Sequence, residues 1–265
     1  MVSAHTLKRR KEEMSNNNNE MKKELGMGAA MATVVGCVIG SGVFFKPTAI
    51  YTATGGAPGL AIIAWVVTSL VCLCAAMTFA EIAILIPETG GMPVYLKKVF
   101  GDKVGYLCGW MQTVVFYPGL VAALAVAVAN QAKLFLGDGM VVPVAIVCII
   151  IMVALNCMGA KVGGAAQTIF TVAKLIPLIL IMIFGFIKGN GNPIFDPMLG
   201  DGLKFGSVLG QLMIAVLFAY EGWTNVGAIA GEMKDPGRDL PKAIVGGVAL
   251  IMAVYIIINL AYLWV

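Results

Sequence analysis

The sequence predicts an all-α polytopic membrane protein, and three observations lead to this fold class. The chain of 265 residues is 60% hydrophobic and only 12% charged, whereas soluble domains are about half apolar and about a quarter charged. It contains seven long apolar runs, of the length that a helix needs to cross a bilayer. Long alternating strand patterns are missing from the sequence. A spanning chain must satisfy its backbone within helices or a closed barrel, so a helical bundle is expected.

Each apolar run is expected to form one spanning helix. The third and fifth runs contain Pro118 and Pro177, which are expected to kink their helices. The runs cover residues 27–50, 58–86, 104–135, 139–157, 164–187, 205–231 and 243–265. The segment before them, residues 1–25, is basic and rich in asparagine and is expected to be a disordered cytoplasmic tail beside the lipid. Residues 26–265 are then the transmembrane domain.

The basic residues are distributed unevenly between the two sides of the predicted bundle. Lysine and arginine gather in the tail and in alternate loops counted from that side, whereas few lie in the other loops. By the positive-inside rule the N-terminus is cytoplasmic. We therefore expect a multi-pass protein of the plasma membrane, with membrane lipid as its surroundings.

Nothing in the sequence indicates an enzyme, a metal site or a cofactor. His5 is the only histidine and lies in the tail, so it cannot act as a buried general base. No Cys or Ser has a neighbouring base that would activate it as a nucleophile. The six cysteines lie in apolar runs, which argues against a disulfide framework. Cys72 and Cys74 leave a helix in different directions and suit packing better than metal binding. No nucleic-acid partner is expected.

The first apolar run is interrupted by glycine and serine. Gly36, Gly40, Ser41 and Gly42 lie near its middle. One interpretation is a small-residue face for close helix packing. The other is a helix that unwinds near Ile39–Gly42, since unwound backbone at membrane depth is tolerated where it lines a polar cavity.

The sixth run contains a second interruption, which favours the unwound interpretation. It places Tyr220, Glu221 and Asn225 in the middle of a span. A carboxylate at that depth costs several kcal/mol and marks a functional site by default. Paired interruptions of this kind indicate the binding site of a secondary transporter.

Two interrupted helices provide the groups that a zwitterion needs. A half-helix that begins near Ser41 and Gly42 offers N–H groups to an α-carboxylate. Carbonyls that end the preceding halves offer acceptors to an α-ammonium, near Val38 and Ile39 in the first run and near Phe218, Ala219 and Tyr220 in the sixth. Trp223 and Tyr117 are expected to shape the pocket.

Lys174 lies deep in the fifth run. It either extends along its helix to an interface or holds an ammonium group inside the bundle beside the first interruption. In the second case it replaces a coupling cation or carries a proton.

Several motifs resemble the amino acid–polyamine–organocation superfamily, and within it the L-type amino acid transporters and bacterial serine/threonine exchangers. They are "GCVIGSGVFFKP", "FAEIAILIPETGGMPVYLKKVFG", "LCGW", "AKLIP", "LFAYEGW" and "GEMKDPGRDLPKAI". The resemblance implies a five-plus-five inverted-repeat fold of the sodium–leucine symporter type, with about twelve spans and spans 1 and 6 unwound. The chain would then hold the first repeat, spans 1–5, plus spans 6–7, and is expected to be truncated after span 7.

The resemblance also implies roles for individual residues. Gly40, Ser41 and Gly42 would bind the substrate carboxylate, and Lys174 would stand where sodium-dependent relatives hold sodium. Glu221 departs from the family pattern, in which glycine or aspartate is frequent, so the substrate range stays open. Animal relatives join a heavy chain through a cysteine after span 3. The loop "KLFLGDGM" has none, so no disulfide-linked partner is expected.

The predicted function is sodium-independent exchange of small neutral L-amino acids such as serine, threonine and alanine, by alternating access. Proton-coupled uptake, with Lys174 or Glu221 as the proton carrier, is the alternative within transport. A non-transporting fragment of such a carrier is a further alternative. A seven-span receptor would not need two interrupted helices.

Overall fold

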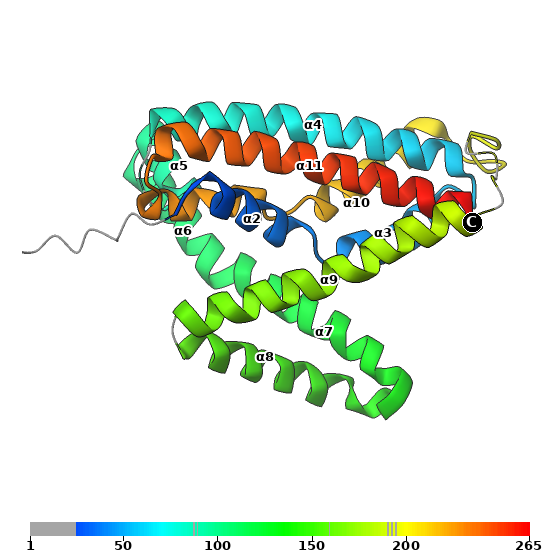
Figure 1. Ribbon diagram of the computed structural model, residues 1–265, viewed down its shortest axis with the longest axis horizontal. Coiled ribbons are helices and arrows are strands. Elements are labelled where there is room, and N and C mark those ends of the chain that lie inside the picture. Colours follow the sequence, from blue (N-terminus) through cyan, green and yellow to red (C-terminus); the bar gives the residue numbers. More distant parts are fainter. Residues whose placement is uncertain are drawn as a thin grey trace, which may run out of the picture.

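The regular elements in the described part of the chain are helices (Figure 1). The computed structural model describes residues 25–265 except 87, 89, 159, 190, 192 and 194. Six helices are long and apolar enough to cross a membrane, or seven if one bent helix pair counts as a single span. The chain is therefore a multi-pass membrane protein, as predicted. The tail predicted over residues 1–25 lies, except for Leu25, outside the described residues.

Two long helices, α4 and α11, form the centre of the fold. α4 covers Pro58–Leu85 and α11 covers Pro236–Trp264, and each has a proline in its first turn, where no backbone donor is lost. They lie side by side and antiparallel (Figure 1). At 28 residues α4 is about 42 Å long, which exceeds the hydrocarbon thickness of a bilayer.

Four shorter pieces pack against this pair. They are α2 (Met27–Val38), α3 (Gly42–Ala53), α10 (Phe205–Ala219) and η3 (Trp223–Glu232), a 3₁₀ helix. α2 packs on α11, and α10 packs on α3 and α4. A 3₁₀ run of ten residues is long for this conformation, which usually lasts three or four residues and marks hinges when it is longer.

A backbone bridge joins the start of span 1 to the end of η3. The Leu25 N–H donates to Glu232 O at 3.0 Å, and the Lys234 N–H donates to Leu25 O at 2.9 Å. The two segments thus pair over one residue, Leu25 beside Met233, in parallel.

The middle of the chain extends away from this core as an arm of helices (Figure 1). α5 (Met92–Phe100) still packs on the core through Tyr95, and the arm beyond it consists of α6 (Asp102–Met111), η1 (Gln112–Phe116), α7 (Tyr117–Leu136), η2 (Asp138–Met140) and α8 (Val141–Cys157). η1 is a π-helical turn just before Pro118. Because proline cannot donate to the carbonyl four residues earlier, the helix widens there and continues. Most apolar side chains of the arm are exposed, as lipid contact requires.

α9 (Ala160–Lys188) leads from the arm back to the core. Its second half packs on α11, where Gly185 approaches Ala261 closely. The observed helices agree with the seven predicted runs except at the start of α11. It begins at Pro236 rather than near residue 243, because Pro236 suits the first position of a helix and Pro241 still falls near its start. The five-plus-five inverted repeat stays a prediction.

Candidate functional site

Span 1 is interrupted between α2 and α3. Ile39 adopts an extended conformation after α2, and α3 restarts at Gly42 with its axis bent by 42°. The backbone N–H groups of Gly42 and Val43 find no backbone acceptor within the described ranges. These two donors carry the partial positive charge of the N-terminus of α3.

Span 6 is interrupted between α10 and η3. α10 ends at Ala219, and the chain turns through Tyr220, Glu221 and Gly222 before the 3₁₀ helix begins. Gly222 has φ of +117°, a left-handed conformation that side chains disfavour. The last carbonyls of α10 point toward this turn and carry partial negative charge.

Two glycines allow the interruptions to touch. A Cβ at position 42 would lie 3.0 Å from Ala219 Cα, and one at position 222 would lie 3.0 Å from Cys37 O. The start of α3 therefore packs on the end of α10, while the turn after α10 packs on the end of α2. A side chain at either position would lie closer to its neighbour than ordinary packing allows, so these backbone approaches require glycine.

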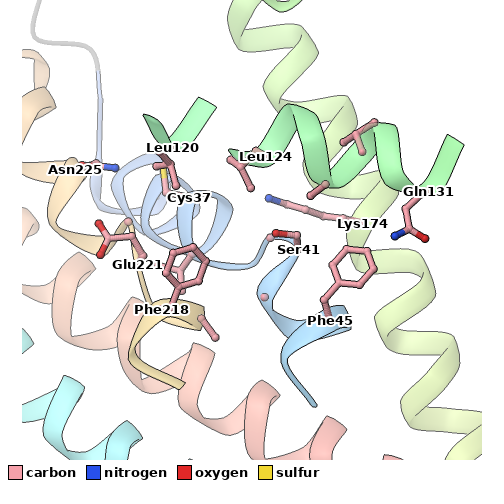
Figure 2. A pocket seen from close by; sticks show the side chains of 17 residues that line it. Cys37, Ser41, Phe45, Leu120, Leu124, Gln131, Lys174, Phe218, Glu221 and Asn225 are labelled. Atoms are coloured by element: carbon pink, nitrogen blue, oxygen red, sulfur yellow. The ribbon is translucent and has the colours of Figure 1, made fainter. Parts of the chain in front are cut away.

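The interruptions open onto a cavity of about 460 Å³, within the range of small-molecule sites. α2, α3, α7, α9 and α10 surround it (Figure 2). It is lined by Cys37, Val38, Gly40, Ser41, Gly42, Phe45, Leu120, Leu124, Ala127, Val128, Gln131, Lys174, Phe218, Ala219, Glu221, Gly222 and Asn225. Its polar groups are thus few and its walls largely apolar.

Lys174 reaches from α9 to the end of α2 (Figure 2). Its ammonium Nζ donates to Gly36 O at 2.6 Å. Gly36 belongs to the last turn of α2, whose carbonyls have no donor further along the helix. The Lys174 ammonium therefore lies beside the first interruption and does not extend along its helix to an interface.

The predicted site residues divide into two groups. Eight of them line the cavity: Val38, Gly40, Ser41, Gly42, Phe218, Ala219, Glu221 and Lys174. Four lie outside its lining: Ile39, Tyr220, Trp223 and Tyr117. Ile39 and Tyr220 belong to the interruptions, but their side chains are buried outside the cavity lining.

The aromatic side chains outside the lining have identifiable contacts. The Tyr220 hydroxyl lies 2.6 Å from Ser69 Oγ on α4. Trp223 packs edge-on against Phe79, at 5.4 Å between ring centroids. The Tyr117 hydroxyl donates to Asn225 Oδ1 at 3.2 Å and lines a second, smaller cavity of about 90 Å³.

Three polar side chains of the main cavity were not predicted as site residues. Cys37, Gln131 and Asn225 line it, although Asn225 was visible as a polar residue within an apolar run. Gln131 lies near the end of its run and Cys37 resembles a packing residue, so neither gave a signal. Among the described residues, no group of three or more His, Cys, Asp and Glu side chains is placed to hold a metal ion.

Comparison with known proteins gives a consistent picture. A sequence profile described as amino acid permease matches residues 25–265. The chain is 38% identical over 255 residues to the serine/threonine exchanger of Bacillus subtilis (strain 168), covering 94% of this chain and 57% of that protein. It is 32% identical over 253 residues to the human large neutral amino acids transporter small subunit 2. This match covers 91% of this chain and 47% of that protein.

A third relative is the human b(0,+)-type amino acid transporter 1, which is 30% identical over 269 residues, covering 96% of this chain and 55% of that protein. These relatives are transporters and exchangers rather than enzymes. The chain spans about half the length of the curated relatives it matches.

Proposed function

The chain belongs to the amino acid permease family, and on that premise we propose that it binds small neutral L-amino acids and exchanges them across the plasma membrane without sodium. Serine, threonine and alanine are the first candidates, because the relatives include a serine/threonine exchanger. The exchange would proceed by alternating access, with the N-terminus on the cytoplasmic side.

One observation carries this proposal: helix ends of opposite polarity open onto the same cavity. The N–H groups that begin α3 at Gly42 are donors without intrahelical partners, suited to a carboxylate. Val38 and Ala219, which end α2 and α10, line the same cavity and offer carbonyl acceptors. A free α-amino acid has both charges on one carbon and can satisfy both sets at once.

The walls of the cavity support a substrate with a small side chain. Phe45 and Phe218 restrict the space beside Ser41 (Figure 2). Lys46 holds its ammonium 4.4 Å from the centre of the Phe218 ring, a cation–π contact that limits the movement of that ring. Glu221 adds an acceptor for a hydroxyl or amide group of the substrate.

Lys174 supports operation without sodium. Its ammonium already provides a positive charge against the carbonyl end of α2, where a bound cation would otherwise do so. Because the Lys174 charge is covalently attached, it does not have to be taken up in each transport cycle.

The proposal is tested by exchange in liposomes. The purified 265-residue chain is reconstituted in vesicles loaded with unlabelled serine, and uptake of labelled serine is measured with sodium or choline outside. Vesicles loaded with buffer alone are the control. We expect uptake that needs internal serine and does not change when choline replaces sodium.

The alternatives give other results. Uptake into empty vesicles that follows an imposed pH gradient indicates proton coupling. Folded protein that binds serine but does not exchange it indicates a carrier fragment that needs further spans. Folded protein that neither binds nor exchanges serine, threonine or alanine would contradict the proposal.

A further inference from the structure

A buried tyrosine on α11 lies behind both interruptions. Tyr255 is fully buried in the centre of the bundle. Its ring packs edge-on against Trp65 of α4, at 5.5 Å between centroids, and against Tyr220, at 5.1 Å. Two aromatic neighbours on different segments leave this ring little freedom to turn.

The hydroxyl of Tyr255 contacts the last residues of both half-helices. It donates to Ala219 O at 2.9 Å and to Val38 O at 3.2 Å. These carbonyls belong to Ala219 and Val38, the last residues of α10 and α2, both of which line the candidate substrate cavity. One hydroxyl has one proton, so it is shared between two acceptors and satisfies neither completely.

The shared proton reduces the electrostatic repulsion between the carbonyl ends of α2 and α10. Two helix C-termini that meet in a low-dielectric interior present partial negative charges to each other and repel. A donor between them reduces the repulsion and fixes the positions of the two oxygens. Each oxygen keeps a second lone pair for another donor.

We propose that Tyr255 is a positioning residue for the substrate. It holds the Val38 and Ala219 carbonyls at the separation at which one ammonium group can contact both. This inference rests on the proposed function, because the ammonium is that of the amino acid. Tyr255 is fully buried and lies outside the cavity lining, so it acts through the two carbonyls and does not contact the substrate itself.

The test compares Tyr255→Phe with Tyr51→Phe. The first substitution keeps the buried ring and removes only the hydroxyl between the two interruptions. The second removes a hydroxyl that also joins span 1 to α11, by a 3.3 Å bond from Tyr51 to Asn259 Oδ1, but at the far end of α3. An effect seen only in Tyr255→Phe is therefore due to the position of its hydroxyl at the interruptions. An effect seen in both variants would come from losing any tyrosine hydrogen bond between span 1 and α11.

In serine exchange, Tyr255→Phe is expected to raise KM about tenfold, because the two carbonyls lose the donor that holds them in position. The maximal rate is expected to change less than KM, and Tyr51→Phe should keep the wild-type KM. An unchanged KM in Tyr255→Phe would overturn the inference. A fall in maximal rate alone would also overturn it.

A second measurement does not depend on transport. Amide hydrogen exchange is followed in peptides that contain residues 38–42 and 219–222. Tyr255→Phe is expected to speed exchange in both peptides together, and Tyr51→Phe in neither. If the wild-type chain exchanges no serine but both peptides respond, the proposed function fails while the positioning of the carbonyls stands. A response in one peptide or in none would refute the positioning.

Discussion

Gly42 offers a direct test of the contact between the two interruptions. In Gly42→Ala the new methyl carbon would lie 3.0 Å from Ala219 Cα and 3.1 Å from Ala219 Cβ. Carbon atoms pack best at about 3.5–4.0 Å. α3 and α10 must therefore move apart by about half an ångström or more, since the nearest contact on one side is backbone and cannot rotate away.

The magnitude follows from two opposing effects. Overpacking of this kind costs about 1–3 kcal/mol. Alanine is favoured over glycine in a helix by about 1 kcal/mol at interior positions, and by less at Gly42, the first residue of α3. We expect a net loss of about 1–2 kcal/mol in stability, as well as weaker serine binding, because the N–H groups at the start of α3 move away from the carbonyl of Ala219.

The assay measures the melting temperature in detergent and the KM for serine exchange. Gly28→Ala is the matched control, because Gly28 lies in α2 of the same span and has open space around its Cα. Gly42→Ala should melt several degrees below wild type with a raised KM, and Gly28→Ala should do neither. If the two variants behave alike, the close approach at Gly42 is not required and the reasoning is refuted.

Two further substitutions and one labelling experiment test the cavity. Lys174→Met should reduce serine exchange more than tenfold, because it removes a charge-assisted hydrogen bond of about 1.5–3 kcal/mol beside the interruption, and sodium should not restore it. Lys188→Met, at the exposed end of the same helix, should exchange serine like wild type, and equal loss in both would contradict this role. Serine should slow maleimide labelling of Cys37, which lines the cavity, but not of Cys74, which is exposed on α4. Mass spectrometry after limited labelling reads both sites, and equal protection of the two would count against substrate in this cavity.

The position of the two interruptions was predictable because their signal is local. Glycine and serine within an apolar run, and a carboxylate within another, are costly unless the backbone or side chain has a special role. The breaks at Ile39–Ser41 and Tyr220–Gly222 follow from those residues alone. The position of Lys174 inside the bundle was predictable for the same reason.

The orientation of aromatic side chains was not predictable. Trp223 and Tyr220 are close in sequence to the second interruption, but their rings turn toward α4 and away from the cavity lining. Which side a ring takes depends on partners such as Phe79 and Ser69, which are far away in the sequence. Tyr255 escaped notice for that reason too, since a tyrosine in an apolar run is ordinary until its distant neighbours are known.

The bridge between Leu25 and Met233 links the two interrupted spans mechanically. Its two backbone hydrogen bonds fasten the first half of span 1 to the second half of span 6 at the ends remote from the cavity. The contact of Gly222 with Cys37 fastens the same two pieces near the cavity. Because α2 and η3 are joined at both ends, we expect them to move together as one unit, so that a displacement of one half-helix is passed to the other.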